Sequence, residues 1–264
     1  MSGSRPDLRR QALHWLREAD PDAKAAGARA LAVDGAVDVA AVLAEPPGIP
    51  GRPARPELVP HTALKPRSMG SVQGRAALIH ALAHIELNAI DLALDATWRF
   101  PGLPEAFYRD WLQVAREEAL HFELLRDHLR TLGFDYGDFP AHNALWEMAE
   151  KTKGDLLARL ALVPRTLEAR GLDASPPLKA KLVGAGDHRA GEILDVILRD
   201  EIGHVAVGNR WYRHVCAARG LDPVATYEVL ARAHAAPRPR GPFNLAARRA
   251  AGFDEDELAA LVKT

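Results

Sequence analysis

The chain has 264 residues, a formal net charge of −1 and 48% hydrophobic residues, an ordinary composition for a soluble globular protein. This charge balance gives no indication of a nucleic acid or an anionic membrane as partner. The single cysteine, Cys216, excludes an internal disulfide framework and favours a reducing, cytoplasmic compartment. The N-terminal segment lacks the apolar core of a secretory signal, and no long uncharged apolar run predicts a membrane-spanning helix.

Abundant Ala and Leu and few β-branched residues predict an all-α fold. Short helices are expected near the N-terminus at residues 6–18, 21–33 and 37–43, where apolar residues recur at helical spacing. Residues 45–68 contain seven prolines, which a regular helix cannot accommodate. Because this segment also carries apolar residues, we interpret it as an arm wrapped on the surface; an inter-domain linker is the alternative.

Four long helices are expected to follow, at residues 71–99, 105–132, 143–170 and 187–219. The third contains Pro164, which removes a helical hydrogen bond and bends the helix, either as a plain kink or in a way that directs Glu168. A Gly- and Pro-containing stretch from Gly171 is expected to end this helix, with a separate short helix at residues 178–183.

The C-terminal part is expected to form helices at residues 222–234 and 253–262, on either side of a turn rich in Pro and Arg. Four arginines gather here: Arg238, Arg240, Arg248 and Arg249. We interpret them as a solvated or ion-paired surface, and contact with a phosphate, as in a nucleotide or tRNA substrate, is the alternative.

Two Glu-x-x-His motifs stand midway along the second and fourth long helices, Glu118 with His121 and Glu201 with His204. At this spacing the two side chains project from one helix face about one turn apart. Roughly one such motif is expected by chance in this chain, so the motif alone is a weak indication. Both pairs, however, interrupt stripes that are otherwise mostly apolar, which places them toward the core.

Each motif is preceded at nearly equal spacing by a Glu on the previous long helix, Glu86 before Glu118 and Glu168 before Glu201. In an antiparallel hairpin Glu86 and Glu118 would lie at nearly the same height, since each stands about 13 residues from the turn. Glu147 and Glu150 are alternatives to Glu168 on the third helix. Four carboxylates and two imidazoles form an oxygen-rich donor set that suits two iron or manganese ions.

Residues beside the ligands are expected to orient them. Glu117 and Asp200 each directly precede a ligand Glu, and each is expected to hydrogen-bond the histidine of the opposite motif. A surface position is the alternative for both. His84 lies on a different face of its helix from Glu86, so we expect it to support the site or to be a hydrogen-bonded core residue, like His80.

The doubled Glu…Glu-x-x-His pattern resembles that of the ferritin-like di-iron carboxylate superfamily. The long helices and residues 74–86, 162–171 and 198–211 more closely resemble the bacterial family called domain of unknown function 455. The resemblance covers nearly the whole chain. It implies a single ferritin-like domain over residues 1–264 with a dinuclear metal site. Its expected parts are N-terminal helices at 1–44, a proline-rich arm at 45–70, a four-helix bundle core at 71–220 and C-terminal helices at 221–264.

The expected function is that of a dinuclear iron (or manganese) carboxylate protein, an O₂-dependent oxidase or hydroxylase that also needs an electron donor. The resemblance supplies no substrate; a small molecule or a modified nucleoside fits the superfamily, and a homodimer is one option for assembly. The alternative is a non-catalytic protein, either a metal-storage or metal-sensing protein or a purely structural helical bundle.

Overall fold

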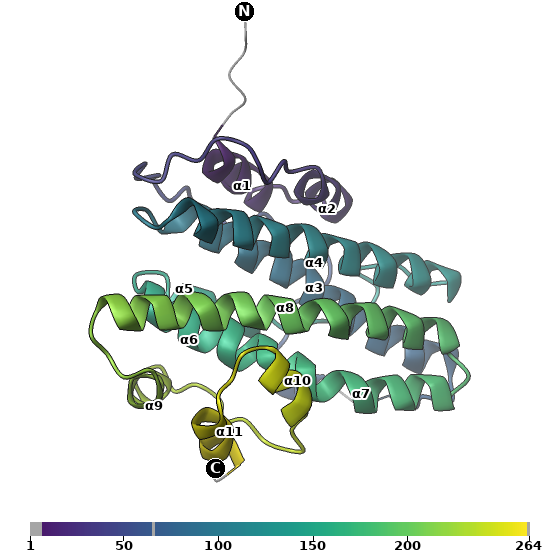
Figure 1. The fold of residues 1–264 in the computed structure, drawn as a ribbon. Coiled ribbons are helices and arrows are strands. Elements are labelled where there is room, and N and C mark those ends of the chain that lie inside the picture. Colours follow the sequence, from purple (N-terminus) through teal and green to yellow (C-terminus); the bar gives the residue numbers. More distant parts are fainter. Residues whose placement is uncertain (1–6, 65–66, 263–264) are drawn as a thin grey trace, which may run out of the picture. The chain divides into compact units, whose positions relative to one another are not determined.

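The computed structural model describes residues 7–64 and 67–262. Within these residues the regular structure is helical, with one isolated β-bridge between Leu58 and Ala141, so the predicted all-α class is confirmed (Figure 1). The chain divides into two compact units, Met1–Trp146 and Glu147–Thr264. The prediction that residues 1–264 form one ferritin-like domain stays a prediction.

The first unit is built on a helical hairpin. Its helices are α1 (Leu8–Leu16), α2 (Pro21–Arg29), the short 3₁₀ helix η1 (His61–Ala63), α3 (Val72–Arg99), α4 (Glu105–Thr131) and the start of α5 (Ala144–Lys151). Ser71 caps α3 by accepting a hydrogen bond from the amide of Gly74 at 3.0 Å. The turn to α4 passes through Gly102, whose φ of +79° favours glycine. Both hairpin helices were predicted within a few residues.

The helix α3 is apolar on almost every side. In the described part of the chain, it is the one helix with the length and composition that could cross a membrane, and 72% of the window concerned is buried. A core helix of a soluble protein meets the same test, so the composition is a weak indication of a membrane. Burial explains the apolar residues, because α1, α2 and α4 all pack on α3.

Residues 37–43 do not form the helix that their sequence predicted. Their carbonyl groups have partners elsewhere: the Asp38 and Ala41 oxygens accept from the Arg9 guanidinium at 2.8 and 2.7 Å. The Val39 oxygen accepts from the amide of Gly102 at 2.7 Å. Because these bonds replace the bonds that a helix needs along its own axis, the segment remains irregular.

The proline-rich segment is hydrogen-bonded to other parts of the first unit. The amide of Gly51 donates to the Leu16 carbonyl at 2.8 Å, and the amide of Val59 donates to the Ala141 carbonyl at 2.8 Å. The Arg52 guanidinium donates to the side-chain oxygen of Asn143 at 2.7 Å. These bonds hold the segment against the unit at three places, whereas a free linker would lack such contacts.

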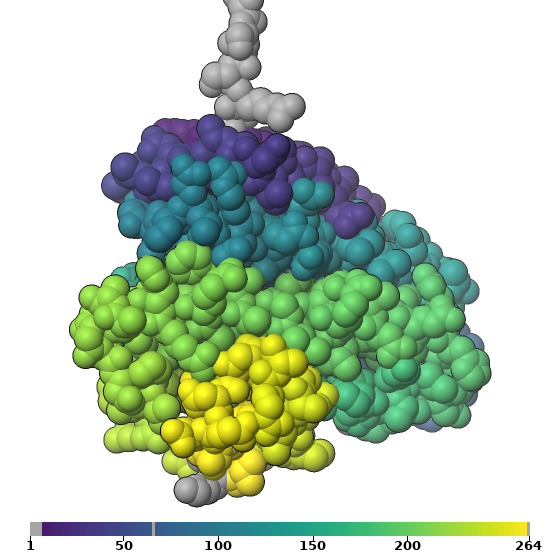
Figure 2. Space-filling view, viewed as in Figure 1, coloured from purple at the N-terminus to yellow at the C-terminus, as the bar shows by residue number. Residues whose placement is uncertain are grey.

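The second unit is built around one helix of 31 residues, α8 (His188–Ala218). The others are α6 (Leu156–Leu162), a π-helix (Val163–Glu168), α7 (Ala169–Gly184), α9 (Pro223–Ala233), α10 (Leu245–Ala250) and α11 (Glu255–Val262). The C-terminal residues, yellow in Figure 2, lie against the green residues of this unit, and α10 packs on α7 and α8. The sequence predicted α8, α9 and α11 but not α10, which Asn244 caps.

The predicted third long helix, residues 143–170, is interrupted. It stops at Lys151, and α6 begins after Asp155, whose side chain accepts from the amide of Leu157 at 2.9 Å. The buried Arg159 guanidinium donates a hydrogen bond to the Ala149 carbonyl at 2.6 Å. That carbonyl would serve the helix if it continued, so the buried arginine and the capping aspartate together favour the break.

The predicted stop near Gly171 is also wrong, because α7 continues through this stretch and includes residues 178–183. Pro176 lacks the amide that would bond the Leu172 carbonyl. The side-chain amide of Asn244 donates to that carbonyl instead, at 3.2 Å. A partner 72 residues away thus compensates for the defect, and the helix persists across 16 residues, or about 24 Å.

Pro164 produces neither a simple kink nor a helix end. It lies in the π-helix Val163–Glu168, in which each turn holds an extra residue. This turn approaches α8 closely, since a Cβ atom on Gly208 would come within 2.5 Å of the Pro164 side chain. Glycine at position 208 is therefore required for the contact, and the widened turn ends at Glu168.

Candidate metal centre

Three of the predicted ligands come together in the first unit: Glu86 on α3, with Glu118 and His121 on α4. All three are buried, with exposed fractions of 3%, 0% and 0%. Their ligand atoms lie within 4.8 Å of one another. The Nδ1 atom of His121 is 3.1 Å from Glu118 Oε2 and 3.6 Å from Glu86 Oε2. This buried Glu–Glu–His group can hold a metal ion.

The hairpin explains the grouping. The helices α3 and α4 run antiparallel around a short turn, so the equal distances of Glu86 and Glu118 from that turn bring them to the same height. The three-residue step to His121 adds the imidazole on the same face of α4. The stripe that carries the motif is buried along its length, through Trp111, Val114, Leu125 and His128.

The group is electrostatically strained without a cation. Burial, and then the neighbouring Glu118, raise the pKa of Glu86 well above its ordinary value, although His121 opposes the effect. Burial lowers the pKa of His121, but its contacts with Glu118 and Glu86 outweigh burial and raise that pKa to about 11. A proton on His121 therefore offsets carboxylate charge here, and a metal ion would compete with that proton.

The spacing of the donor atoms also suits a metal. Bonds of about 2.0–2.2 Å from oxygen and nitrogen ligands to a cation bring adjacent donors to roughly 3 Å from each other. The observed separations of 3.1 and 3.6 Å are close to this value. In addition, the buried Oε2 atom of Glu86 has no hydrogen-bond partner among the described residues. An unsatisfied buried acceptor of this kind fits a cation.

The second unit contributes its own predicted ligands on α8 and the π-helix. Glu201 and His204 are buried on α8, with exposed fractions of 8% and 1%, and Glu201 Oε1 lies 3.9 Å from His204 Nδ1. Glu168 ends the π-helix and is half-buried, with its Oε2 atom shielded from solvent. Within the described residues of this unit taken alone, no three such ligand atoms form a group.

The alternatives to Glu168 are less suited to a buried centre. Glu147 is exposed, and Glu150 lies 3.3 Å from Lys153 Nζ with 39% of its side chain exposed. Both stand on α5, before the interruption at residues 152–155. Glu168, by contrast, has a carboxylate oxygen that is shielded from solvent.

Glu117 and Asp200, which were expected to orient the ligands, each accept a hydrogen bond from a residue on their own helix. The side-chain amide of Gln113 donates to Glu117 at 2.7 Å, and Arg199 donates to Asp200 at 2.8 Å. Both acidic residues are half-buried. Their expected bonds to His204 and His121 stay predictions.

His84 belongs to a hydrogen-bond network that the sequence did not reveal. Its Nδ1 atom is 2.7 Å from the Tyr136 hydroxyl, its Nε2 atom is 3.0 Å from the His142 carbonyl, and Asn88 is also in contact with it. His80, one turn earlier, accepts from the amide of Gly137 at 3.0 Å. The network thus favours the hydrogen-bonded core alternative for both histidines. No local signal could predict partners more than 50 residues away.

Acid is expected to destabilise the first unit through these two histidines. Burial lowers the pKa of His80 to about 4 and that of His84 to about 3. Below about pH 6.5 these two histidines bind protons in the unfolded chain but stay neutral in the folded protein. The free energy of unfolding is therefore highest above that pH and falls as the pH drops toward 4. The loss is at most about 1.4 kcal/mol per pH unit for each histidine. Urea denaturation at pH 7 and 5 measures it.

The variant His80→Gln is expected to lose less stability between pH 7 and 5 than the wild type. The exposed His14 on α1 supplies a matched control, since His14→Gln should leave the pH dependence unchanged. An identical pH dependence in the His80 and His14 variants would contradict the assignment of a buried neutral ring at position 80.

An all-helical chain with a buried Glu–Glu–His group is, by its fold and site, a candidate metal-binding protein. The chain belongs to the family described as "Protein of unknown function (DUF455)", which matches residues 17–259. It is similar to an uncharacterized protein of Haemophilus influenzae, with 50% identity over 213 residues, or 78% of this chain and 74% of that protein. No solved structure matches the chain. The resemblance to this family is thereby confirmed.

Proposed function

We propose that this protein is a dinuclear metal protein of the ferritin-like type, with iron as its expected metal and manganese as the alternative. The observation that carries the proposal is the buried group of Glu86, Glu118 and His121, whose donor atoms have the spacing of ligands around one cation. Burying two carboxylates beside each other is costly without a cation to offset them.

The second ion is inferred from the repeat in the sequence. The same pattern, a Glu followed on the next long helix by Glu-x-x-His, recurs as Glu168, Glu201 and His204. In the second unit α7 supplies about 24 Å of rise between Glu168 and the start of α8. Such a rise is what the repeat requires if Glu168 and Glu201 are to reach a common level. We propose that these residues complete the centre begun by the first unit, as in a four-helix carboxylate bundle.

The donor set defines the expected chemistry. Four carboxylates with two imidazoles favour iron or manganese over copper or zinc. A pair of such ions supplies redox chemistry with O₂, which supports an O₂-dependent oxidase or hydroxylase as the activity. The chain's own residues would hold the ions with deprotonated ligands and exclude bulk water, because the stripe around Glu118 is buried. Such an enzyme would also need an electron donor, and its expected substrate is a small molecule or a modified nucleoside.

The proposal is tested by metal content and oxygen uptake. Elemental analysis of aerobically purified protein is expected to find iron or manganese in the wild type and a large loss in Glu118→Ala and His204→Ala. Glu123→Ala is the matched control, because Glu123 is a half-exposed glutamate on the same helix as Glu118. After anaerobic loading with iron(II), the wild type and the control should consume O₂ faster than the two ligand variants.

The pattern of losses separates the alternatives. Equal and negligible metal in the wild type and all variants would contradict the proposal and favour a structural helical protein. Metal that depends on Glu118 but is unaffected by His204→Ala would contradict the dinuclear arrangement. Bound iron without any faster O₂ uptake would contradict the oxidase and favour a metal-binding role without turnover.

A further inference from the structure

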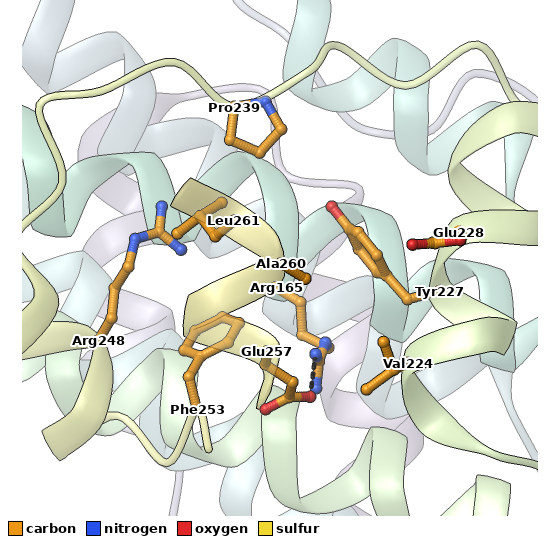
Figure 3. Close-up of a pocket in the computed structure, with 10 residues that line it drawn as sticks. All are labelled: Arg165, Val224, Tyr227, Glu228, Pro239, Arg248, Phe253, Glu257, Ala260 and Leu261. Carbon is orange, nitrogen blue, oxygen red and sulfur yellow. Dashed lines mark hydrogen bonds and ion pairs between the residues drawn. The ribbon is translucent and has the colours of Figure 1, made fainter. Parts of the chain in front are cut away.

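A second candidate site lies entirely within the second unit and shares none of the proposed metal ligands. It is a cavity of about 120 Å³ between α9 and α11, with the π-helix behind it (Figure 3). Its walls are largely apolar and include Val224 and Tyr227 of α9, Ala260 and Leu261 of α11, and Phe253. The polar group that reaches this apolar cavity from the π-helix is the guanidinium of Arg165.

Arg165 is buried, with 4% of its surface exposed, and only part of its hydrogen-bonding capacity is used. Its Nη2 atom donates to Glu257 at 2.6 Å, which is the dashed contact in Figure 3. Its Nε and Nη1 atoms are buried and have no hydrogen-bond partner among the described residues. Leaving buried donors unsatisfied costs about 1–3 kcal/mol for each group, so an acceptor brought by a ligand would be stabilised here.

The two carboxylates that line the cavity, Glu228 and Glu257, do not serve these donors, which have no hydrogen-bond partner among the described residues. Glu257 is shared: its Oε1 atom accepts from Arg165, while its Oε2 atom accepts from Arg213 and from the amide of Asp254. Arg248, the other guanidinium at the cavity, is engaged by Asp173 at 2.6 Å. The hydrogen-bond donors that still lack an acceptor therefore belong to Arg165. An anionic or carbonyl oxygen is the acceptor that would satisfy them.

Aromatic rings hold the Arg165 guanidinium in place. Its Cζ atom lies 4.4 Å from the ring centroid of Tyr212 and 5.1 Å from that of Phe253. The Tyr227 ring, 5.7 Å away, is fixed by the contact of its hydroxyl with Thr166 Oγ1 at 2.9 Å. Contacts with ring faces stabilise the cation but supply no oxygen acceptor, so the guanidinium is positioned while some of its N–H groups still lack one.

We propose that this cavity is a binding site for a small carboxylic acid, with its carboxylate on Arg165 and a short apolar body against Phe253 and Leu261. The size sets the limit, since a volume of about 120 Å³ equals about four waters in the liquid. A branched chain of about four carbons fills such a space. The walls then cover the apolar body, and the charge-assisted bond to the guanidinium fixes its orientation.

Isobutyrate is the probe that matches this description, and the protein is used as the full chain after treatment with chelator. The metal is removed first so that isobutyrate bound to a metal ion does not contribute to the measured binding. NMR or calorimetric titration is expected to show saturable binding with a Kd of about 1 mM. The neutral amide isobutyramide should bind about tenfold more weakly, because a charge-assisted hydrogen bond is about twice as strong as a neutral one.

Ala260→Phe places a ring in the cavity and is expected to abolish the binding of isobutyrate. Ala259→Phe is its matched control, because Ala259 is exposed on the same helix and does not line the cavity. Titration of wild type that fails to saturate, equal affinity for acid and amide, or unchanged affinity in Ala260→Phe would each overturn the proposal. None of these results depends on the proposed metal centre, which is tested separately by metal content.

Discussion

Replacing Glu86 by glutamine is expected to leave the metal-free protein at least as stable as the wild type and to abolish its stabilisation by metal. Burial and Glu118 raise the pKa of Glu86 well above its ordinary value, so the ionised carboxylate is unfavourable there without a cation. Glutamine keeps the shape and removes the charge. It leaves Glu118 and His121 as a buried pair at 3.1 Å.

The same substitution removes one of the three grouped ligands. A metal ion present at about 100 times its Kd stabilises the wild type by about 2.7 kcal/mol, and weaker binding reduces this gain. Thermal unfolding is measured in chelator and after anaerobic addition of iron(II) or manganese(II). We expect the wild type to respond strongly to metal and Glu86→Gln to respond little.

Glu123→Gln controls for the loss of a charge, since Glu123 is a half-exposed partner of Arg29. It should respond to metal as the wild type does. A metal-free Glu86→Gln protein that is much less stable than the wild type would indicate that Glu86 has a structural role and not the role of a ligand.

Replacing Asp91 by alanine is expected to destabilise the protein by about 3–5 kcal/mol, because the buried charge of Lys24 is left without its partner. Lys24 Nζ lies 2.5 Å from Asp91 Oδ1, and their side chains are 2% and 3% exposed. The ammonium retains one further bond, to the Gly51 carbonyl at 2.9 Å. One neutral acceptor does not offset a buried charge.

The pair itself is expected to contribute little. Burial raises the pKa of Asp91 even though Lys24 lowers it, so the cost of removing the charges from water exceeds their attraction. The double variant Lys24→Met with Asp91→Leu is therefore expected to lie much closer to the wild type than Asp91→Ala. Urea denaturation compares the stability of the double variant with that of Asp91→Ala and the wild type. Asp127→Ala, at an exposed position, is the control. A double variant as unstable as Asp91→Ala would contradict this account.

Features that depend on residues close in sequence could be predicted. The helices α3, α4 and α8 follow from apolar periodicity and local caps, and the meeting of Glu86 with Glu118 follows from counting residues to one turn.

Features that depend on distant partners could not be predicted. Arg9 takes the carbonyls of residues 38 and 41 and prevents the expected helix, while Asn244 rescues α7 at Pro176. Arg165 illustrates the same limit: the sequence shows an arginine beside a proline, but its burial under aromatic rings depends on residues from α8, α9 and the C-terminal segment. Tertiary contacts override local preference in each case.

The most direct test of the dinuclear centre is anomalous X-ray scattering at the iron and manganese absorption edges from a crystal of the metal-loaded protein. We expect two anomalous peaks of one of these metals, held by Glu86, Glu118 and His121 together with Glu168, Glu201 and His204. No peak at Glu118 and His121 would contradict the metal centre, and a single peak without a ligand from α8 would contradict its dinuclear form.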